Sequence, residues 1–391
     1  MDPAAWIALN SVKGVGKVLY KRLVLRFGSP ESVFRAPGAE LARMEGAKPP
    51  AVKAIKEFAD WEAAADEAAR AAAAGAEIIA FTDPRYPANL RETHDPPPYL
   101  YVKGSLIPED RVAVAIVGSR AATPFGRQIT RRIGGELAAK GITVVSGGAR
   151  GIDTEAHRGA LDVKGRTVAV LGCGIDIIYP PENGELYSKI AESGAVITEY
   201  PLGTPPEASN FPPRNRIISG MSLGVVVMEA TDDSGSLITA SYSIEQGREV
   251  YAMPGSIGSP TSRGTNNLIK KGAKLVQGSQ DIMLDLFPYL KGYLRELALE
   301  ENSGAAKAGA DGKDGPGSAG EVIMPRPPEQ VFGLGPEEKA LFECISVEPV
   351  HVDVLARKSG VAVPRALSLL LGMELKGAVR QVSGMRYVRE A

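Results

Sequence analysis

Cysteine, histidine and aromatic residues are scarce in this sequence, and each shortage excludes a class of protein. The chain of 391 residues has two cysteines, Cys173 and Cys344, and three histidines, and 6% of its residues are aromatic. Two cysteines so far apart do not form a disulfide framework, and they suit a reducing compartment. The sequence also has no Cys-x-x-Cys pair, so it does not show the ligand spacing of a structural zinc site. We therefore expect neither a disulfide nor a bound metal.

Neither charge nor hydrophobicity is concentrated along the chain. The 45 basic and 46 acidic side chains leave a net charge of -1, so any nucleic-acid site must be local rather than a property of the whole surface. Apolar runs such as Leu223 to Met228 are far too short to span a bilayer, and no positive segment followed by an apolar core stands at the N-terminus. We expect a soluble cytoplasmic protein with no membrane partner.

A low-complexity segment divides the chain. Residues 301–320 read ENSGAAKAGADGKDGPGSAG, with six glycines and no apolar side chain larger than alanine. Such a segment cannot bury enough surface to offset the entropy lost on ordering. We predict a flexible linker over residues 291–333. It separates a helical N-terminal domain (1–76) and a central domain (77–290) from a C-terminal module (334–391).

The first hundred residues read as helices followed by extended chain. Gly28 and Gly75 each end a predicted helix, because glycine readily takes the left-handed conformation that closes one. Prolines between Glu77 and Asp110 exclude long helices there and favour extended segments that wrap a neighbour. The helices that we predict cover residues 6–11, residues 17–27 after a turn at 14–16, and an alanine-rich stretch at about 51–74.

After Arg111 the pattern changes to short β-rich apolar runs that alternate with amphipathic helices. Runs that are apolar on both faces and joined by helices are typical of buried strands in a parallel sheet. The central domain is therefore predicted to be doubly wound α/β and to end near Phe287. Its predicted strands are Val112–Val117, Thr143–Ser146, Thr167–Leu171, Ala195–Thr198, Gly224–Met228 and Glu249–Ala252.

Glycine and arginine follow the first two of these strands. One strand ends in Gly118-Ser119-Arg120, and the next ends in the run SGGARGID at residues 146–153. Ligands of open parallel sheets bind beyond the carboxyl ends of the strands. Glycines let a phosphate approach the backbone, N–H groups at a helix start point toward it, and Arg120 and Arg150 can fork onto its oxygens. Two such loops predict a phosphate-binding surface. The alternative is that the glycines only form tight turns and that the arginines are solvated.

Neither loop matches a nucleotide-cofactor fingerprint. The sequence lacks Gly-x-Gly-x-x-Gly after a strand and lacks the Gly-Lys-Ser/Thr end of a P-loop, so it favours neither NAD binding nor ATP hydrolysis. We expect no cofactor.

A third cluster, Asn210-Phe211-Pro212-Pro213-Arg214-Asn215-Arg216, precedes the Gly224 strand. An aromatic ring with guanidinium groups suits sequence-tolerant binding of a single strand, since a base stacks on the ring while arginine meets the backbone. Core packing by Phe211, with the arginines paired to Glu199 or Glu229, is the alternative. The run DSGSLIT at residues 233–239 offers hydroxyl and N–H groups as a second phosphate contact or as a helix cap.

Several motifs occur in one order that resembles the DprA/Smf family of DNA-processing proteins. GSR, SGGARGID, YPPEN, FPPRNRIIS, EATDDSGSLITA, GREVYAMPG and NLIKKGA follow one another between about residues 78 and 286, and the set is far more specific than any single motif. The resemblance implies an extended Rossmann-like fold that binds single-stranded DNA in a positively charged pocket, protects incoming DNA and helps load the RecA recombinase in natural transformation and recombination. It also implies a homodimer that is not an enzyme.

By matching position, the resemblance also implies site residues. Arg120 and the loop at 146–151 would contact phosphates, Phe211 and the segment Arg214–Arg216 would lie at the pocket rim, and Leu268 and Ile269 would lie in the dimer contact. The DNA-binding residues expected in this sequence are Gly118, Ser119, Arg120, Ser146, Gly147, Gly148, Arg150, Gly151, Phe211, Arg214, Asn215, Arg216, Gly235, Ser236 and Thr239.

The enzymatic alternative is a Rossmann enzyme similar to the phosphoribohydrolases that cleave nucleoside monophosphates. That class uses a Pro-Gly-Gly-x-Gly-Thr loop and a following glutamate, whereas this chain has Ser234-Gly235-Ser236-Leu237, and Glu245 falls late in the helix. Asp153 and His157, four residues apart, imitate an acid/base pair, but no third group stands near them. We therefore interpret His157 and Cys173 as buried structural residues and expect no catalytic residue.

Two flanking modules also bear on DNA. The run VKGVGK at residues 12–17 resembles the hairpin of helix-hairpin-helix modules, in which N–H groups at a helix start meet phosphate. A second DNA contact at Lys13, Gly14, Gly16 and Lys17 is thus predicted, with a solvated helical domain as the alternative. At the C-terminus, three helices and a tight hairpin resemble a winged helix. Its third helix, at residues 364–376, is mostly apolar, so a protein contact or a regulatory role is as well supported as base reading.

Overall fold

A computed structural model describes residues 2–289, 335–346, 349–361, 366, 369–370, 372–374, 378–382 and 386–389. The chain divides into two compact units, residues 1–286 and residues 287–391. The predicted linker, residues 291–333, lies outside the described residues.

The first unit begins with short helices, and those at Pro3–Ser11 and Lys17–Phe27 confirm the helices predicted at residues 6–11 and 17–27. The single helix predicted over 51–74 is wrong, because residues 57–60 break it into α5 and α6. The break lets Phe58 and Trp61 both pack on Phe34, with ring centroids 5.4 and 4.7 Å away, a tertiary contact that local propensity does not reveal. The helices are α1 Pro3–Ser11, α2 Lys17–Phe27, α3 Pro30–Arg35, α4 Gly38–Leu41, α5 Pro49–Lys56 and α6 Trp61–Ala73.

A nine-stranded sheet forms the centre of this unit, with the strand order β1-β2-β6-β5-β4-β3-β7-β8-β9. The strands from β6 to β9 run parallel, and β1 and β2 add an antiparallel edge. The proline-rich segment thus contributes extended chain, as predicted. The strands are β1 Glu77–Ala80, β2 Tyr99–Gly104, β3 Ala113–Val117, β4 Thr143–Ser146, β5 Thr167–Val170, β6 Ala195–Thr198, β7 Gly224–Val227, β8 Glu249–Ala252 and β9 Lys274–Leu275.

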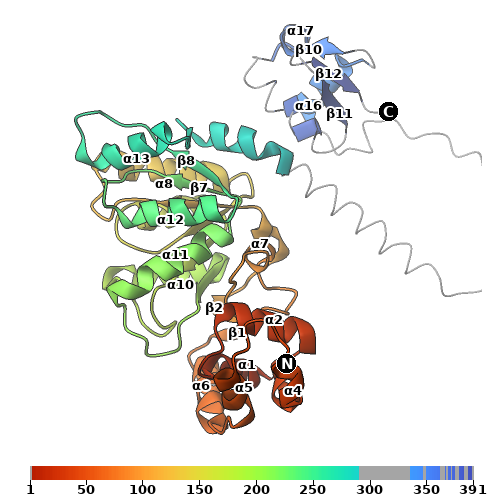
Figure 1. Cartoon of the computed structure of the whole chain (residues 1–391). Helices are drawn as coiled ribbons and strands as arrows, with labels where there is room; N and C mark the ends of the chain where they lie inside the picture. The colour runs from red at the N-terminus through yellow and green to blue at the C-terminus, as the bar shows by residue number, and fades with distance from the viewer. Residues whose placement is uncertain are drawn as a thin grey trace, which may run out of the picture. The chain divides into compact units, whose positions relative to one another are not determined.

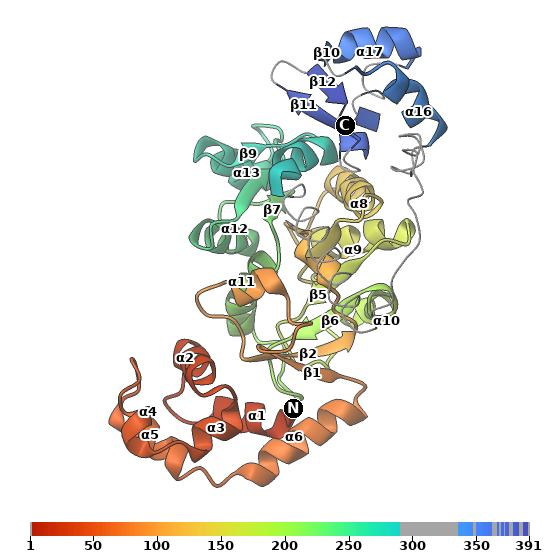
Figure 2. The ribbon, with the colours of Figure 1, turned by 90° about the vertical axis from the view of Figure 1, so that its right-hand side faces the viewer.

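Helices cover both faces of the sheet, which confirms the doubly wound α/β prediction. Figure 2 shows α8, α9 and α10 on one side of the strands and α11, α12 and α13 on the other. The strands β3, β4, β5, β6 and β7 are buried along their whole length, and alternate residues of β3 belong to two different cores. These helices are α8 Pro124–Ala138, α9 Ile152–Asp162, α10 Gly184–Ser193, α11 Phe211–Gly220, α12 Gly235–Glu245 and α13 Pro260–Lys270, and shorter turns are α7 Ala88–Arg91, η1 Pro108–Arg111, η2 Pro181–Asn183 and η3 Ala208–Asn210.

The direction of winding reverses at β3. From β3 the chain proceeds through β4 and β5 to β6 on one side, and it then returns to β7 on the other side of β3. Figure 1 shows β7 next to β8, far from the antiparallel edge formed by β1 and β2. A crevice forms at the carboxyl ends of the strands where the winding reverses, and it is the usual ligand site of such sheets. The loop after β3 therefore lies where this fold binds ligands.

The second unit has its own core. A three-stranded antiparallel sheet has the order β10-β12-β11, and Leu341, Phe342 and Leu355 are buried beside it. Its elements are α16 Pro336–Glu343, β10 Val350–His351, α17 Val352–Ser359, β11 Val379–Val382 and β12 Arg386–Arg389. The helix predicted over 364–376 is helical where it is described. The strands of the predicted hairpin are β11 and β12, and residues 383–385 between them lie outside the described residues.

Candidate nucleic-acid interface

The loops that follow β3 and β4 meet at the point where the winding reverses. The backbone N–H of Ile152 donates to the Ser119 carbonyl at 3.2 Å, and the Ser119 N–H donates to the Glu229 carbonyl at 2.8 Å. The Ser146 hydroxyl is buried and donates to the Ile116 carbonyl at 2.6 Å. The structure thus brings the two glycine loops together and joins them to the end of β7, whereas the Ser146 hydroxyl is used inside the sheet.

Side chains donate hydrogen bonds to the backbone carbonyls of the second glycine loop, residues 146–151. Arg214 Nη1 donates to the Gly147 carbonyl at 2.6 Å, and Asn183 Nδ2 and Tyr187 Oη both donate to the Gly148 carbonyl at 2.9 Å. The Thr154 hydroxyl donates to Ala149 O at 2.7 Å. The carbonyls of this loop are thus occupied, and the Ala149 N–H donates to Asp153 Oδ2 at 3.3 Å.

The remaining N–H groups of this loop have the backbone geometry of a concavity that suits an anion. Gly148 and Gly151 have φ of +66° and +77°, and left-handed residues next to right-handed ones make successive N–H groups converge. Among the described residues, the N–H groups of Gly148, Arg150 and Gly151 have no protein acceptor. A Cβ atom at Gly148 would lie 2.6 Å from Tyr187 Oη, so only glycine fits at this position.

A buried guanidinium lies beneath the loop. Arg214 is 3% exposed and also donates to the Val170 carbonyl. Burial lowers the pKa of Arg214, and the neighbouring Asp153 opposes that shift. Asp153 starts α9, where burial raises its pKa to about 6 while Arg214 lowers it. The prediction that Arg214 lies at the pocket rim is wrong, since the side chain forms part of the floor instead.

An aromatic ring and an exposed arginine form the mouth of the site. The Arg120 guanidinium lies 5.0 Å from the centroid of the half-buried Phe211 ring, and the Tyr179 ring lies 5.7 Å from the same centroid. Arg120 is exposed and makes no ion pair with any described residue. A cation over an aromatic face beside a row of N–H groups can receive a phosphate and an adjoining planar group together.

Arg150 is held by a surface carboxylate. Its guanidinium pairs with Glu182, and the two side chains are 53% and 52% exposed. This ion pair must open before Arg150 can meet a phosphate, and at such exposure it costs little to open.

Arg216 points away from the glycine loops. It is 4% exposed, and its guanidinium contacts Glu199 Oε2 and the Asp95 carbonyl, both at 2.5 Å. The alternative interpretation, an arginine paired with Glu199, therefore describes this residue, and the rim position predicted for it is wrong. Between the two arginines, Asn215 donates to Gly235 O at 3.2 Å and links α11 to α12. A part for Asn215 and Arg216 in DNA binding stays a prediction.

The N-terminus of α12 is capped by the side chain of Ser234, which directly precedes the helix. The Ser234 hydroxyl accepts from the N–H of Ser236, and the hydroxyls of these two serines lie 2.8 Å apart. Ser236 and Thr239 are buried, whereas Gly235 is exposed. Of the three residues predicted to bind DNA in this segment, Gly235 is the one that is exposed to solvent.

His157 and Cys173 have the buried positions that the sequence predicts. His157 Nδ1 lies 2.7 Å from Thr167 Oγ1, and this hydroxyl donates to the Val144 carbonyl, so Nδ1 carries the proton. Burial lowers the pKa of His157 to about 3 and raises that of Cys173 to about 11. Neither side chain is poised as a base or a nucleophile.

One of the two lysines predicted for the N-terminal DNA contact, Lys17, forms an ion pair within the protein. Lys17 Nζ lies 2.6 Å from Glu199 Oε2, the oxygen that also binds Arg216. Lys21 Nζ donates to the Thr93 carbonyl at 2.8 Å. Lys13, Gly14 and Gly16 are exposed. The structure thus separates Lys17 from its neighbours, since its ammonium helps to attach the helical segment to the sheet.

Two further features concern the described part of the chain as a whole. No group of His, Cys, Asp and Glu side chains within it lies close enough together to hold a metal ion. None of the helices described has the length and apolar character needed to cross a membrane.

A doubly wound sheet with glycine loops at its reversal point places this chain among the Rossmann-like proteins. The comparisons with known proteins define the group more narrowly.

The chain belongs to the DprA/Smf family of DNA-processing proteins. The family model described as DNA recombination-mediator protein A matches residues 77–287, and the model described as the DprA winged helix domain matches residues 325–385. The chain is 36% identical to Protein Smf of Synechocystis over 99% of both chains, and 41% identical to Protein Smf of Escherichia coli over 78% of this chain and 75% of that relative.

A solved structure agrees with this assignment. The X-ray structure of DNA processing protein A from Streptococcus pneumoniae is 34% identical, with a TM-score of 0.64 over 73% of this chain and 98% of that one. The extended Rossmann-like core and the winged helix that the resemblance implied are thus features of this chain.

Proposed function

We propose that this chain binds single-stranded DNA at the carboxyl edge of its sheet. The observation that carries the proposal is the Arg120 guanidinium on the Phe211 ring beside the N–H groups of Gly148 and Gly151. Backbone N–H groups and arginine receive phosphates of any sequence, and an aromatic ring stacks on any base. A base inside a duplex is already stacked on both faces, so this ring favours a single strand.

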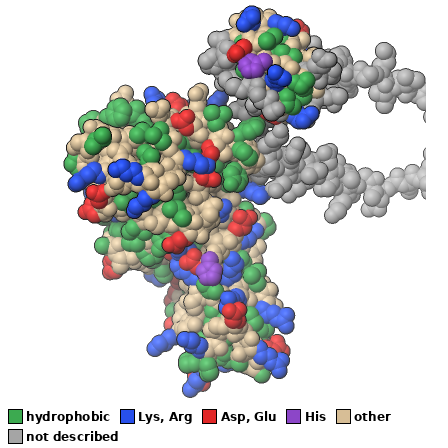
Figure 3. All heavy atoms as spheres, turned by 45° about the horizontal axis from the view of Figure 1, so that its top comes forward, with side chains coloured by type: hydrophobic (Ala, Val, Ile, Leu, Met, Phe, Trp, Pro, Cys, Tyr) green, Lys and Arg blue, Asp and Glu red, His purple; other side chains and the backbone are tan. Residues whose placement is uncertain are grey.

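The charge distribution supports a local site. Figure 3 shows one face of the molecule, on which basic and acidic side chains are interspersed rather than gathered by sign. With a net charge of -1, attraction to DNA has to come from the few cations that lack an acidic partner. Arg120 is such a cation among the described residues.

The biological role that we propose follows from family membership. A protein that holds incoming single-stranded DNA protects it and helps load RecA in natural transformation and recombination, and this role requires a cytoplasmic location. The stimulation of RecA filament assembly on coated single-stranded DNA measures it directly. We propose that the chain is not an enzyme. In support, Glu245 ends α12, about 15 Å from Gly235 at the helix start, whereas the hydrolase class needs its glutamate close to the loop.

Charge reversal at Arg120 tests the DNA site. We expect Arg120→Glu to weaken binding of oligothymidine and of mixed-sequence single strands by a similar factor of about ten or more, because a phosphate contact carries no sequence information. The slope of log affinity against log salt should fall by about one. Fluorescence anisotropy at two salt concentrations, with duplex as competitor, measures both quantities.

Lys140→Glu is the matched control for this measurement. Lys140 is exposed at the far end of α8, so its reversal changes net charge equally without altering the site. An Arg120→Glu variant with unchanged, salt-dependent affinity would remove Arg120 from the site. If the wild-type protein does not bind the oligomer, the proposal fails, and release of free base from nucleoside monophosphates then becomes the assay of choice.

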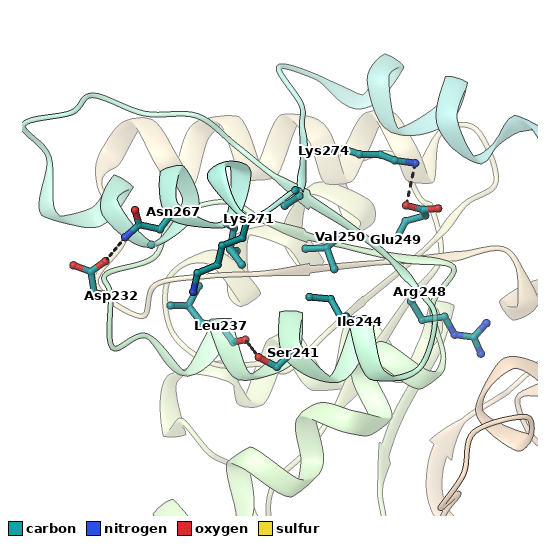
Figure 4. A pocket seen from close by; sticks show the side chains of 14 residues that line it. Asp232, Leu237, Ser241, Ile244, Arg248, Glu249, Val250, Asn267, Lys271 and Lys274 are labelled. Atoms are coloured by element: carbon teal, nitrogen blue, oxygen red, sulfur yellow. Dashed lines mark hydrogen bonds and ion pairs between the residues drawn. The ribbon is translucent and has the colours of Figure 1, made fainter.

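We propose a homodimer through the groove between α12 and α13. The groove has a volume of about 690 Å³, and its lining includes Leu237, Ile244, Val250 and Leu268; Figure 4 shows Leu237 and Ile244 on α12, across the groove from Lys271. The Ile244 side chain is 66% exposed, and together with the apolar residues that line the groove it forms a surface that a second copy of the chain would cover. The position of Leu268 supports the predicted dimer contact, and Ile269 is its half-buried neighbour.

A charge placed in the groove tests the dimer. We expect Leu268→Asp to convert dimers to monomers, because a carboxylate cannot be buried unpaired in an apolar contact. Molar mass from light scattering at several concentrations gives the result. Leu25→Asp, at an exposed position on α2, is the control. A wild-type protein that stays monomeric at high concentration contradicts the proposal.

A further inference from the structure

Phe125 is an exposed aromatic side chain at the edge of the sheet where the candidate site lies. It is 67% exposed and stands in the first turn of α8, which follows the loop of Gly118, Ser119 and Arg120. A single exposed apolar residue needs no explanation by itself. What distinguishes Phe125 is the set of contacts and charges around it.

The first turn of α8 is fixed against the end of β7. The Thr123 N–H and hydroxyl donate to the Glu229 carboxylate at 2.9 and 2.6 Å, and the Thr123 hydroxyl also accepts from the Gly126 N–H at 2.9 Å. Because Glu229 also receives the Ser119 N–H on its carbonyl, the turn and the glycine loop share one anchor. Phe125 is therefore presented from a rigid part of the site.

Arg127 brings a second free cation to this turn. Its side chain is exposed, and Nε donates to the Ala122 carbonyl at 3.1 Å, which folds the guanidinium back over the loop that carries Arg120. Five residues separate Arg120 and Phe125 in sequence, so their Cα atoms lie within about 18 Å.

Neighbouring arginines are neutralised, whereas these two are not. Arg131 pairs with Asp162, Arg132 with Glu136, and Arg158 with Glu155. Among the described residues, Arg120 and Arg127 make no ion pair with a carboxylate. In sequence, the two arginines without an ion pair thus stand on either side of Phe125, and exposed cations with an exposed aromatic ring are the composition of a single-strand binding surface.

We propose that Phe125 is a second base-stacking platform, and that Arg120 and Arg127 hold the phosphates between it and the Phe211 ring. The strand would run from the N–H groups of the second glycine loop, across Arg120, to the first turn of α8. This inference rests on the proposed single-strand function and extends it to a longer binding site. A protein segment seated on Phe125 is the competing occupant.

The test is the dependence of binding on oligonucleotide length, using the full chain. Phe125→Ala should lower affinity for long oligothymidines by about tenfold and leave the shortest oligomer that wild type binds unaffected, because a short strand ends before this turn. Phe125→Tyr should bind like wild type. Arg127→Ala should weaken long oligomers only and lower the salt slope by about one. Fluorescence anisotropy over a length series measures all three.

Two controls match these changes. Val163→Ala removes a partly exposed apolar side chain that follows α9, and Lys140→Ala removes a cation from the far end of α8. Phe125→Ala binding that equals wild type at every length overturns the inference and leaves the protein segment as occupant. If wild type binds no oligomer of any length, the proposed function itself has failed, and the two failures are thus distinguishable.

Discussion

Arg214→Met is expected to lower the free energy of unfolding by about 3–5 kcal/mol. The guanidinium is 3% exposed and occupies the carbonyls of Gly147 and Val170. Its removal takes the guanidinium donor from both carbonyls and leaves the buried Asp153 carboxylate without the stronger of its two positive neighbours, Arg214 and Arg120. The large effect therefore comes from the groups left behind rather than from the loss of one attraction.

Urea unfolding followed by circular dichroism measures this change. Arg158→Met is the control, because Arg158 is an exposed arginine paired with Glu155, and its loss should change stability by about 1 kcal/mol or less. Adding Asp153→Asn to Arg214→Met should recover part of the loss, since the uncompensated charge is then absent. If Arg214→Met unfolds like the control, the guanidinium is not what supports the glycine loop.

Glu199→Ala is expected to destabilise the protein by about 3 kcal/mol or more. One oxygen of this carboxylate binds both Arg216 Nη2 and Lys17 Nζ. The Arg216 side chain is 5% exposed, so it would keep a buried charge with no anion in direct contact other than Asp95, 3.5 Å away. The helical segment would lose the same anchor, because Lys17 begins α2.

Lys17→Ala separates the contribution of the link between α2 and Glu199 from that of the buried Arg216 charge. The Lys17 side chain is 36% exposed, so its own loss should cost about 1 kcal/mol or less, although it removes the same link between α2 and β6. Denaturant unfolding gives both values, and limited proteolysis reports release of the helical segment. Equal effects of the two substitutions would mean that the link, and not the buried arginine, determines the stability at this point.

The six strands predicted after Arg111 agree with the structure almost to the residue, whereas the short β9 was not predicted. Thr143–Ser146, Ala195–Thr198 and Glu249–Ala252 have the predicted bounds, because a parallel strand buried on both faces leaves a continuous apolar run in the sequence. The helices at the N-terminus were less predictable. The break at residues 57–60 depends on Phe34, and no local pattern encodes that contact.

The candidate site was predictable in its backbone and less so in its side chains. Glycines after strands locate the loops, but sequence alone does not tell which arginine of α11 is buried or what it pairs with. Lys17 and Glu199 are 182 residues apart, and the Glu182 partner of Arg150 is 32 residues away. Distant pairs of this kind are set by the fold.

Asn183 and Tyr187 were missed as contributors to the loop. Both side chains donate hydrogen bonds to the Gly148 carbonyl, although they are 35 and 39 residues away in sequence. In the sequence, the YPPEN segment indicates only a family pattern. The available signal is its position: polar side chains that follow β5 reach the same edge as those after β3 and β4.

The two buried arginines of α11 also fix the helical register of that segment. Arg214 and Arg216 point to different parts of the protein, one to the glycine loop and the other to the anchor of the helical segment. One residue added between them would rotate everything beyond it by about 100°, and Arg216 would be turned away from Glu199. Natural variation in this stretch should therefore take the form of replaced side chains at constant length, whereas the loops around it are free to grow or shorten.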